Sequence, residues 1–248
     1  MEKEEYSKMY ELELDYWWFK GKRFLVKIWL DKYFSNRKNL TILDVGCGTG
    51  MNMQLLEQYG LVYGLDASDD SLSFCKKRGL NNLAKASAEN IPCKNDCFDI
   101  VTMLDVLYHK NIRDDNRALK EISRTLKKDG ILIITDSAMK CLWSRHDIAV
   151  HAGRRYNKME LQKKLENTGF KIEKISYFNF LLFLPVFVSR KICNFAGAGP
   201  KSDIQKINPF LNTLIHKYYS FEVYLLKYLN YPWGISIFAI GKNKKTNQ

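Results

Sequence analysis

The stretch ILDVGCGTG, residues 42–50, predicts a buried β-strand that ends in a glycine-rich turn. A helical pattern follows from Met51 to Tyr59, and a second apolar run, residues 61–65, ends in Asp66. A strand, a glycine turn, a helix and a second strand tipped by a carboxylate form a nucleoside-binding half of a doubly wound α/β fold. The carboxylate suits a ribose, because it accepts two hydrogen bonds from the diol.

The spacing of the glycines distinguishes two classes of nucleoside ligand. Dinucleotide folds use G-x-G-x-x-G, whose last glycines bring a helix N-terminus to a pyrophosphate. Here Asp44, Gly46, Gly48 and Gly50 follow one another at intervals of two, with the acid ahead of the first glycine. That carboxylate favours a ligand with an ammonium group and would repel a pyrophosphate. The stretch resembles motif I of the class I S-adenosylmethionine (SAM) dependent methyltransferases.

Two later segments are similar to the same family. ASAENIP at 86–92 resembles the loop that contacts the adenine ring, but Ser87 stands where an Asp is usual. FDIV at 98–101 matches the fourth strand, after which Tyr108 replaces a usual carboxylate and His109 is retained. The resemblance implies SAM as cofactor and no metal. The implied SAM-binding residues are Asp44, Gly46, Cys47, Gly48, Gly50, Asp66, Ala67, Ser87, Ala88, Glu89, Leu104 and Asp105.

The N-terminal segment, residues 2–34, predicts two helices with the aromatic and basic run YWWFKGKR at 16–23 between them. One interpretation is helix packing across the sheet edge. The other is a lid over the donor pocket that lends side chains to the acceptor. The W-W-F-x-G-x-R pattern resembles the N-terminal segment of a subset of these enzymes, similar to methyltransferase types 11 and 12, that is often linked to glycan and secondary-metabolite assembly.

Local signals place the helices that follow. Ser68 is a candidate N-cap, and Asn157 opens a helix that closes at Gly169. A helix that carries Leu119 is expected to end at Asp129–Gly130, ahead of a strand at 131–135.

The loop after the fifth strand, residues 143–156, has a high polar content and leaves the sheet edge where ligands bind. His109, His151 and His146 are the candidate general bases, because imidazole titrates near neutral pH, and His109 ranks first by its place at the donor strand tip. For the two arginines in this loop the alternatives are a surface ion pair and an anion clamp. The candidate acceptor-binding residues are Trp17, Trp18, Lys20, Arg23, Tyr108, Arg154, Arg155 and Tyr156.

About fifty residues separate the sixth strand, 171–177, from the last, 234–240. The apolar run at 178–188 is too short for a bilayer span of about 20 residues. A second helical stretch covers 207–229. Two interpretations stay open for this insertion: an apolar cap that closes the acceptor pocket, or an amphipathic surface that rests on a membrane.

The sequence therefore predicts one α/β domain over 1–248, a Rossmann-like doubly wound seven-stranded sheet with an N-terminal helical lid and a helical insertion before the last strand. The expected parts are the lid at 1–38, the SAM-binding core at 39–180, the cap at 181–232, the last strand at 233–242 and a disordered basic tail at 243–248.

Composition bounds the partners and the compartment. A formal net charge of +12 admits nucleic acid, an anionic membrane or an anionic substrate and selects none of them. The six cysteines include no C-x-x-C pair, which makes a zinc site improbable. A charged N-terminus shows no signal peptide, so we expect a cytoplasmic protein, or one peripheral to the membrane through 178–230.

The expected reaction is methyl transfer from SAM to an O or N atom of a small-molecule, sugar or lipid-linked acceptor. Enzymes that methylate exocyclic amines carry an Asn/Asp-Pro-Pro-aromatic tip, where this chain has LDVL at 104–107. Pyrimidine C5 methylation needs a Pro-Cys nucleophile, but Pro92-Cys93 precedes the fourth strand. The alternatives are an RNA or protein methyltransferase, and a non-catalytic SAM-binding or NAD-type Rossmann protein. Nucleic acid is disfavoured because no recognition domain is appended.

Overall fold

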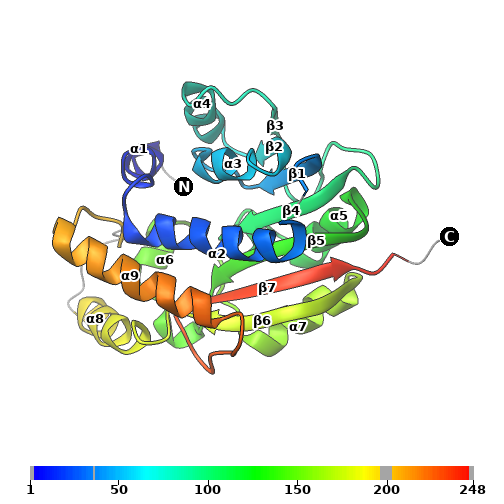
Figure 1. The fold of residues 1–248 in the computed structure, drawn as a ribbon. Helices are drawn as coiled ribbons and strands as arrows, with labels where there is room; N and C mark the ends of the chain where they lie inside the picture. Colours follow the sequence, from blue (N-terminus) through cyan, green and yellow to red (C-terminus); the bar gives the residue numbers. More distant parts are fainter. Residues whose placement is uncertain (1–2, 36, 196–202, 246–248) are drawn as a thin grey trace.

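The computed structural model describes residues 3–35, 37–195 and 203–245. It contains a seven-stranded sheet in the order β3-β2-β1-β4-β5-β7-β6 (Figure 1). The strands are β1 (Leu40–Val45), β2 (Gly60–Asp66), β3 (Leu83–Lys85), β4 (Phe98–Leu104), β5 (Leu126–Ser137), β6 (Phe170–Phe178) and β7 (Ser236–Asn243). The first five run parallel, and β7 lies antiparallel between β5 and β6. The predicted Rossmann-like fold is confirmed.

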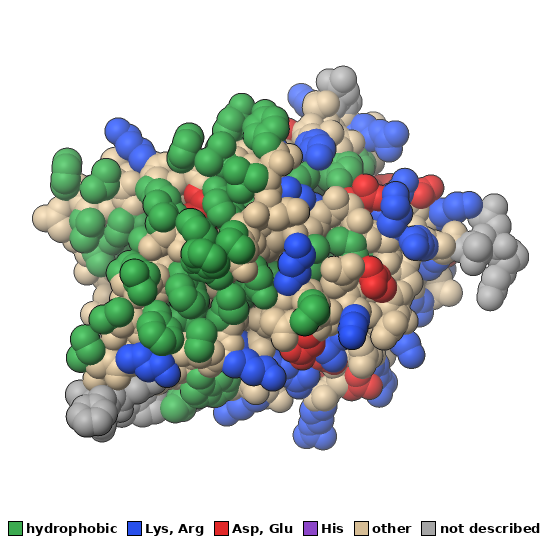
Figure 2. All heavy atoms as spheres, turned by 90° about the horizontal axis from the view of Figure 1, so that it is seen from below, with side chains coloured by type: hydrophobic (Ala, Val, Ile, Leu, Met, Phe, Trp, Pro, Cys, Tyr) green, Lys and Arg blue, Asp and Glu red, His purple; other side chains and the backbone are tan. Residues whose placement is uncertain are grey.

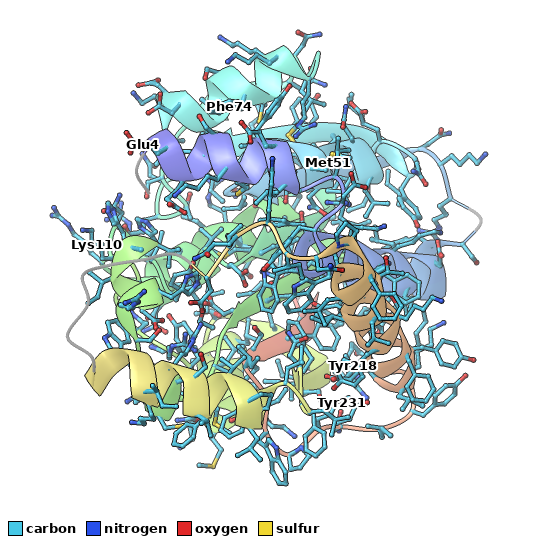
Figure 3. The ribbon with its side chains drawn as sticks, turned by 90° about the vertical axis from the view of Figure 1, so that its left-hand side faces the viewer. Glu4, Met51, Phe74, Lys110, Tyr218 and Tyr231 are labelled. Carbon is cyan, nitrogen blue, oxygen red and sulfur yellow. The ribbon has the colours of Figure 1, made fainter. Side chains whose placement is uncertain are left out.

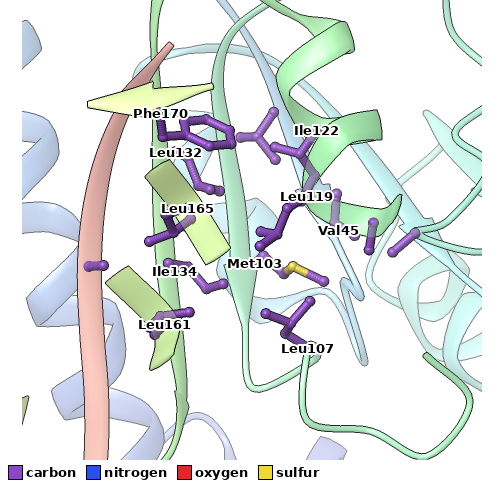
Figure 4. Packing of buried hydrophobic residues seen from close by; sticks show 14 of the residues in the cluster. Val45, Met103, Leu107, Leu119, Ile122, Leu132, Ile134, Leu161, Leu165 and Phe170 are labelled. Carbon is purple, nitrogen blue, oxygen red and sulfur yellow. The ribbon is translucent and has the colours of Figure 1, made fainter. Parts of the chain in front are cut away.

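Helices cover both faces of the sheet. One face carries α5 (Asp115–Thr125) and α7 (Lys158–Asn167), whose buried Leu and Ile side chains pack on β4 and β5 (Figure 4). On the other face lie α2 (Trp17–Phe34), α3 (Met51–Leu56) and α9 (Pro209–Leu225). Trp29 of α2 is fully buried there, with its ring 5.4 Å from that of Phe238 in β7.

The remaining helices are α1 (Lys3–Leu12), α4 (Asp69–Lys77), the short 3-10 turn η1 (Lys140–Leu142), α6 (Arg145–Ala149) and α8 (Phe183–Phe195). Leu72 and Cys75 of α4 join the buried cluster on the same face as α3, whereas side chains of α1, α6 and α8 lie near the ends of β1, β2 and β4. In Figure 1, α1 lies close to α4. No helix in the described part of the chain is long and apolar enough to cross a bilayer.

Three local predictions hold and three need correction. Ser68 caps α4, Asn157 caps α7, and Gly169 ends α7 with a φ of +98°. The aromatic run predicted between the first two helices lies within α2 from Trp17 onward, because Tyr16 is the extended residue ahead of that helix.

The fifth helix ends at Thr125, four residues before its predicted end. Leu126 pairs with Phe98 of β4, and its carbonyl accepts a hydrogen bond from the Asn243 side chain at 3.0 Å. The predicted basic tail is also wrong for its first residues. Asn243 is buried in β7, and the Lys245 ammonium donates to Asp96 at 2.6 Å. Of the predicted segments, residues 1–2, 36, 196–202 and 246–248 lie outside the described ones.

Candidate active site

A cavity of about 1190 Å³ opens at the carboxyl ends of β1, β2 and β4. Its walls come from α1, α2, the glycine-rich loop, the loops after β3 and β4, α6 and the two helices of the insertion. Figure 3 faces this side of the molecule, with α1 marked by Glu4, the start of α3 marked by Met51 and α9 marked by Tyr218. Ligands of doubly wound sheets bind at this edge.

The glycine-rich loop requires glycine at two positions on the cavity wall. Gly46 and Gly48 have φ values of +70° and +56°, and residues other than glycine rarely adopt such backbone angles. A Cβ at Gly46 would stand 2.2 Å from Val106, and one at Gly48 would stand 2.5 Å from Met9 of α1. The loop therefore presents bare backbone to the cavity, which allows a ligand to approach closely.

Asp66, at the tip of β2, is held by the backbone of two loops. One carboxylate oxygen accepts from the Gly48 amide at 3.1 Å, and the other accepts from the Ser68 amide at 2.9 Å. Burial raises the pKa of Asp66, while these amide donors lower it. The carboxylate lines the cavity beside Ala67, so it is oriented before any ligand arrives.

Asp44, at the end of β1, has one satisfied and one unsatisfied oxygen. Its Oδ1 accepts from Thr102 at 2.5 Å and from Asn52 at 3.0 Å, whereas its buried Oδ2 has no hydrogen-bond partner among the residues that the structure describes. Burial raises the pKa of Asp44 to about 7. An unpartnered buried oxygen is costly, and a ligand ammonium would satisfy it.

These features fit SAM. The bare glycine backbone, the oriented Asp66 and the open oxygen of Asp44 match the nucleoside and the ammonium group of that molecule in chemical type. The other predicted cofactor residues on the cavity wall are Cys47, Ser87, Ala88, Leu104 and Asp105.

Two predicted cofactor residues lie away from the cavity wall. The Glu89 carboxylate turns toward α5 and accepts from the Asp114 amide at 2.8 Å. Gly50 faces α4 and the turn after it, where a Cβ would stand 3.1 Å from Cys75 and 2.5 Å from Leu80. The helix behind the loop therefore needs Gly50 for close packing.

Hydrogen bonds and an ion pair hold the first helix, α1, against the glycine-rich loop. Glu13 lines the cavity, accepts from the Thr49 hydroxyl and pairs with Arg78 of α4 at 2.6 Å. Arg78 also donates to the Tyr10 carbonyl and lies 4.2 Å from the centre of its ring. These contacts tie α1 to the loop and to α4, so α1 closes one side of the cavity.

The helix α2 brings aromatic and basic side chains to the other half of the cavity. Trp17, Trp18 and Arg23 line it, as predicted, whereas Lys20 does not. The buried residue is Lys22, which pairs with Asp105 and stands 4.5 Å above the Trp18 ring. Burial lowers the pKa of Lys22 to about 7.

Sequence reasoning missed Lys22. The available signal was helical spacing, because Trp18 and Lys22 are four residues apart and share one helix face. The run is predicted to lie between the two N-terminal helices, so its residues are not assigned to a helix face.

The three candidate histidines all line the cavity. The rings of His109 and His151 lie 6.0 Å apart, and His146 Nδ1 accepts from the Asp203 amide at 3.0 Å. Burial lowers the pKa of His109 to about 4, and it also lowers that of His146. His109 is therefore neutral at physiological pH, and its unprotonated Nδ1 accepts a hydrogen bond from the Asn111 amide at 3.2 Å.

Both arginines of the loop after β5 form ion pairs within the protein. An ion pair was one of the two alternatives for them, and an anion clamp was the other. Arg154 pairs with Asp115 at 2.8 Å and lies outside the cavity. Arg155 lines the cavity but is 2% exposed and pairs with Asp147 at 2.7 Å. The arginines hold the loop in shape more than they offer free charge to a ligand.

The two tyrosines of the predicted acceptor set are both buried. Tyr108 lines the cavity, but Tyr156 is fully buried outside it, with its hydroxyl donating to Asp115 at 2.9 Å. The insertion adds Arg190, which pairs with Asp203 at 2.6 Å and lines the cavity, and which the sequence did not single out.

Comparison with known proteins shows that the core of the chain is similar to methyltransferases. A family model described as a methyltransferase domain matches residues 43–134. An uncharacterised protein of Methanocaldococcus jannaschii is 33% identical over 159 residues, which cover 62% of this chain and 64% of that protein. The ubiquinone/menaquinone biosynthesis C-methyltransferase UbiE of Campylobacter jejuni is 30% identical over 109 residues, 40% of this chain and 46% of its own. The chain thus spans less than two-thirds of the length of these curated relatives.

Solved structures agree on the fold. A protein solved in complex with the Trm112 methyltransferase activator of Haloferax volcanii has a TM-score of 0.64 at 14% identity, over 99% of this chain and 97% of that one. A SAM-dependent methyltransferase of Thermotoga maritima has a TM-score of 0.60 at 20% identity, over 97% of this chain and 96% of that one. At these identities the likeness shows the fold alone.

Proposed function

We propose that this chain, whose residues 43–134 match the methyltransferase domain family, is a SAM-dependent methyltransferase of class I that transfers the methyl group of SAM to an O or N atom of a small-molecule, sugar or lipid-linked acceptor. When bound, SAM supplies an activated methyl group on a sulfonium. The sheet, with its antiparallel β7, differs from the dinucleotide Rossmann order and argues against the NAD-type alternative.

One observation carries the proposal: a single cavity joins a donor half to an acceptor half. The donor half holds the glycine-rich loop with Asp44 and Asp66, and the acceptor half holds Trp18, Lys22 and His109. Methyl transfer needs two reactants held in one water-poor space, and that requirement matches this arrangement.

We assign three kinds of role to residues of the cavity, the binding of SAM, the removal of a proton from the acceptor and the positioning of the acceptor. We assign Asp66 to the ribose hydroxyls and the open oxygen of Asp44 to the ammonium. A hydroxyl acceptor loses a proton, and the neutral His109 accepts one. We assign Lys22, which is buried and paired with Asp105, to the positioning of the acceptor.

We extend the proposal to the parts of the chain. Residues 1–38 act as the lid, since α1 is fastened over Gly48 and α2 lines the acceptor half. Residues 39–180 and 233–242 form the SAM-binding core, and 181–232 form the cap, which contributes Leu182 and Arg190 to the cavity wall.

The names of two relatives suggest which acceptors to test first. UbiE of C. jejuni and the ubiquinone biosynthesis O-methyltransferase of Pelagibacter ubique, 34% identical over 103 residues, are named for quinone biosynthesis. We carry over only the coarse class, a small molecule, and we favour one with an apolar part because the insertion adds Leu182, Pro185 and Val186 to the wall.

The test is methyl transfer from SAM labelled in its methyl group. The protein is incubated with separate organic-soluble, aqueous small-molecule, RNA and protein fractions of a cell extract. We expect label in a small-molecule fraction, and no label with Asp66→Ala. Label confined to RNA or protein, or none in any fraction, would overturn the proposed acceptor class.

A further inference from the structure

The insertion carries a continuous apolar surface on the outside of the molecule. Figure 2 shows it as a broad hydrophobic area over α8 and α9, while Lys and Arg side chains dominate the other half of this view. We call it the apolar face. Its exposed residues are Leu181, Leu184, Val188, Ile192, Phe210, Leu211, Leu214, Phe221, Tyr224, Tyr228, Leu229 and Trp233.

Helical spacing shows that this exposure is regular along each helix. On α8, Leu184, Val188 and Ile192 recur every four residues and are 65%, 47% and 65% exposed. On α9, Phe210 and Phe221 are 79% and 62% exposed, although its opposite side is fully buried against α2. α9 therefore has apolar residues on a buried side and on a solvent-facing side, and the α8 segment has them toward the cavity and toward solvent, which is unusual for surface helices.

The exposed charges on α8 and α9 themselves are basic. The exposed side chains in the described parts of α8 and α9 include Lys191 and Lys217 and no Asp or Glu. Glu222 of α9 is buried and accepts from the Phe180 amide, and Asp203 is paired with Arg190. An apolar surface with basic residues at its margin is complementary to an anionic lipid bilayer.

We propose that the apolar face docks this protein on an anionic membrane surface. The aromatic residues at the end of α9 support a bilayer, since Tyr and Trp prefer the boundary between acyl chains and headgroups. A second copy of the chain is disfavoured, because a two-fold contact would place two basic margins of like charge together at a net charge of +12 each.

The docking surface adjoins the cavity. Leu184 and Val188 of α8 face outward, while Leu182, Pro185 and Val186 of the same segment line the cavity. A lipid-linked acceptor would thus need to move only past α8 to reach the donor. This consequence rests on the proposed function, whereas docking itself does not.

The test is co-sedimentation with sucrose-loaded vesicles, either of phosphatidylcholine alone or with about one-third phosphatidylglycerol. We expect binding to the anionic vesicles, weaker binding to the neutral ones, and release as salt rises. The variant Val188→Glu/Phe221→Glu should bind at least about tenfold more weakly, because it places two acids at the lipid surface.

The matched control is Met159→Glu on α7, which is 72% exposed and lies on the opposite face of the sheet. It should bind as the unchanged protein does. Thermal melting followed by circular dichroism shows whether each variant is folded, independently of SAM. Absent binding, or equal binding by Val188→Glu/Phe221→Glu and the control, would overturn the proposal. A dimer in sedimentation velocity that Val188→Glu/Phe221→Glu abolishes would overturn it in favour of a second copy.

Discussion

Gly46→Ala tests whether the glycine-rich loop is shaped as the structure has it. The residue has a φ of +70°, and a Cβ there would stand 2.2 Å from one methyl of Val106 and 3.1 Å from the other. The left-handed conformation costs about 1–2 kcal/mol for alanine. Overlap with a stiff β-branched side chain adds about 1–3 kcal/mol. We expect the free energy of unfolding to fall by about 2–5 kcal/mol.

Gly79→Ala is the matched control, because Gly79 has a φ of +81° but no atom of the described residues lies within 4 Å of the position that its Cβ would take. It should lose only the conformational part, about 1–2 kcal/mol. Urea denaturation measures both losses. Val106→Ala should restore part of the Gly46→Ala loss in a double-mutant cycle. Equal losses for the two glycines, or no coupling to Val106, would refute the steric reasoning.

Three further outcomes follow from the charged groups. S-adenosylhomocysteine should bind about tenfold more weakly for each pH unit below about 7, because a protonated Asp44 must lose its proton to pair with an ammonium, and calorimetry should find Asp44→Asn nearly insensitive to pH. Arg155→Met should lower the free energy of unfolding by about 3–5 kcal/mol because it removes the closest charged partner of the buried Asp147, a loss that adding Asp147→Leu should reduce in urea denaturation. Arg78→Met should free α1 by removing its contacts to Glu13, seen as faster hydrogen exchange in α1 with unchanged exchange in α7.

The sheet was predictable because its signals are local. Each parallel strand is a short apolar run, and the spacing of Asp44 and the glycines identifies the loop between β1 and α3. The boundaries that failed depend on distant partners. Leu126 continues a helical pattern in sequence, but it joins the sheet because it pairs with Phe98 and its carbonyl accepts a hydrogen bond from Asn243.

The residues of the proposed donor half of the cavity were more predictable from the sequence than those of the proposed acceptor half. Asp44 and Asp66 follow directly from strand ends, and both line the cavity. The acceptor half is assembled from segments far apart in the sequence, so spacing does not show that Arg154 would meet Asp115 or that Lys22 would be buried. Only the packing of α2 against the strand ends decides which basic residue faces inward.

The most direct test of the central claim is calorimetric titration with S-adenosylhomocysteine, with NADH as the comparison ligand. The account predicts micromolar binding of the homocysteine compound, a loss of about tenfold or more in Asp66→Ala, and no change in Asp69→Ala, whose carboxylate is exposed and paired with Lys85. Absent binding, a preference for NADH, or equal affinity in both variants would contradict the assignment of this cavity to SAM.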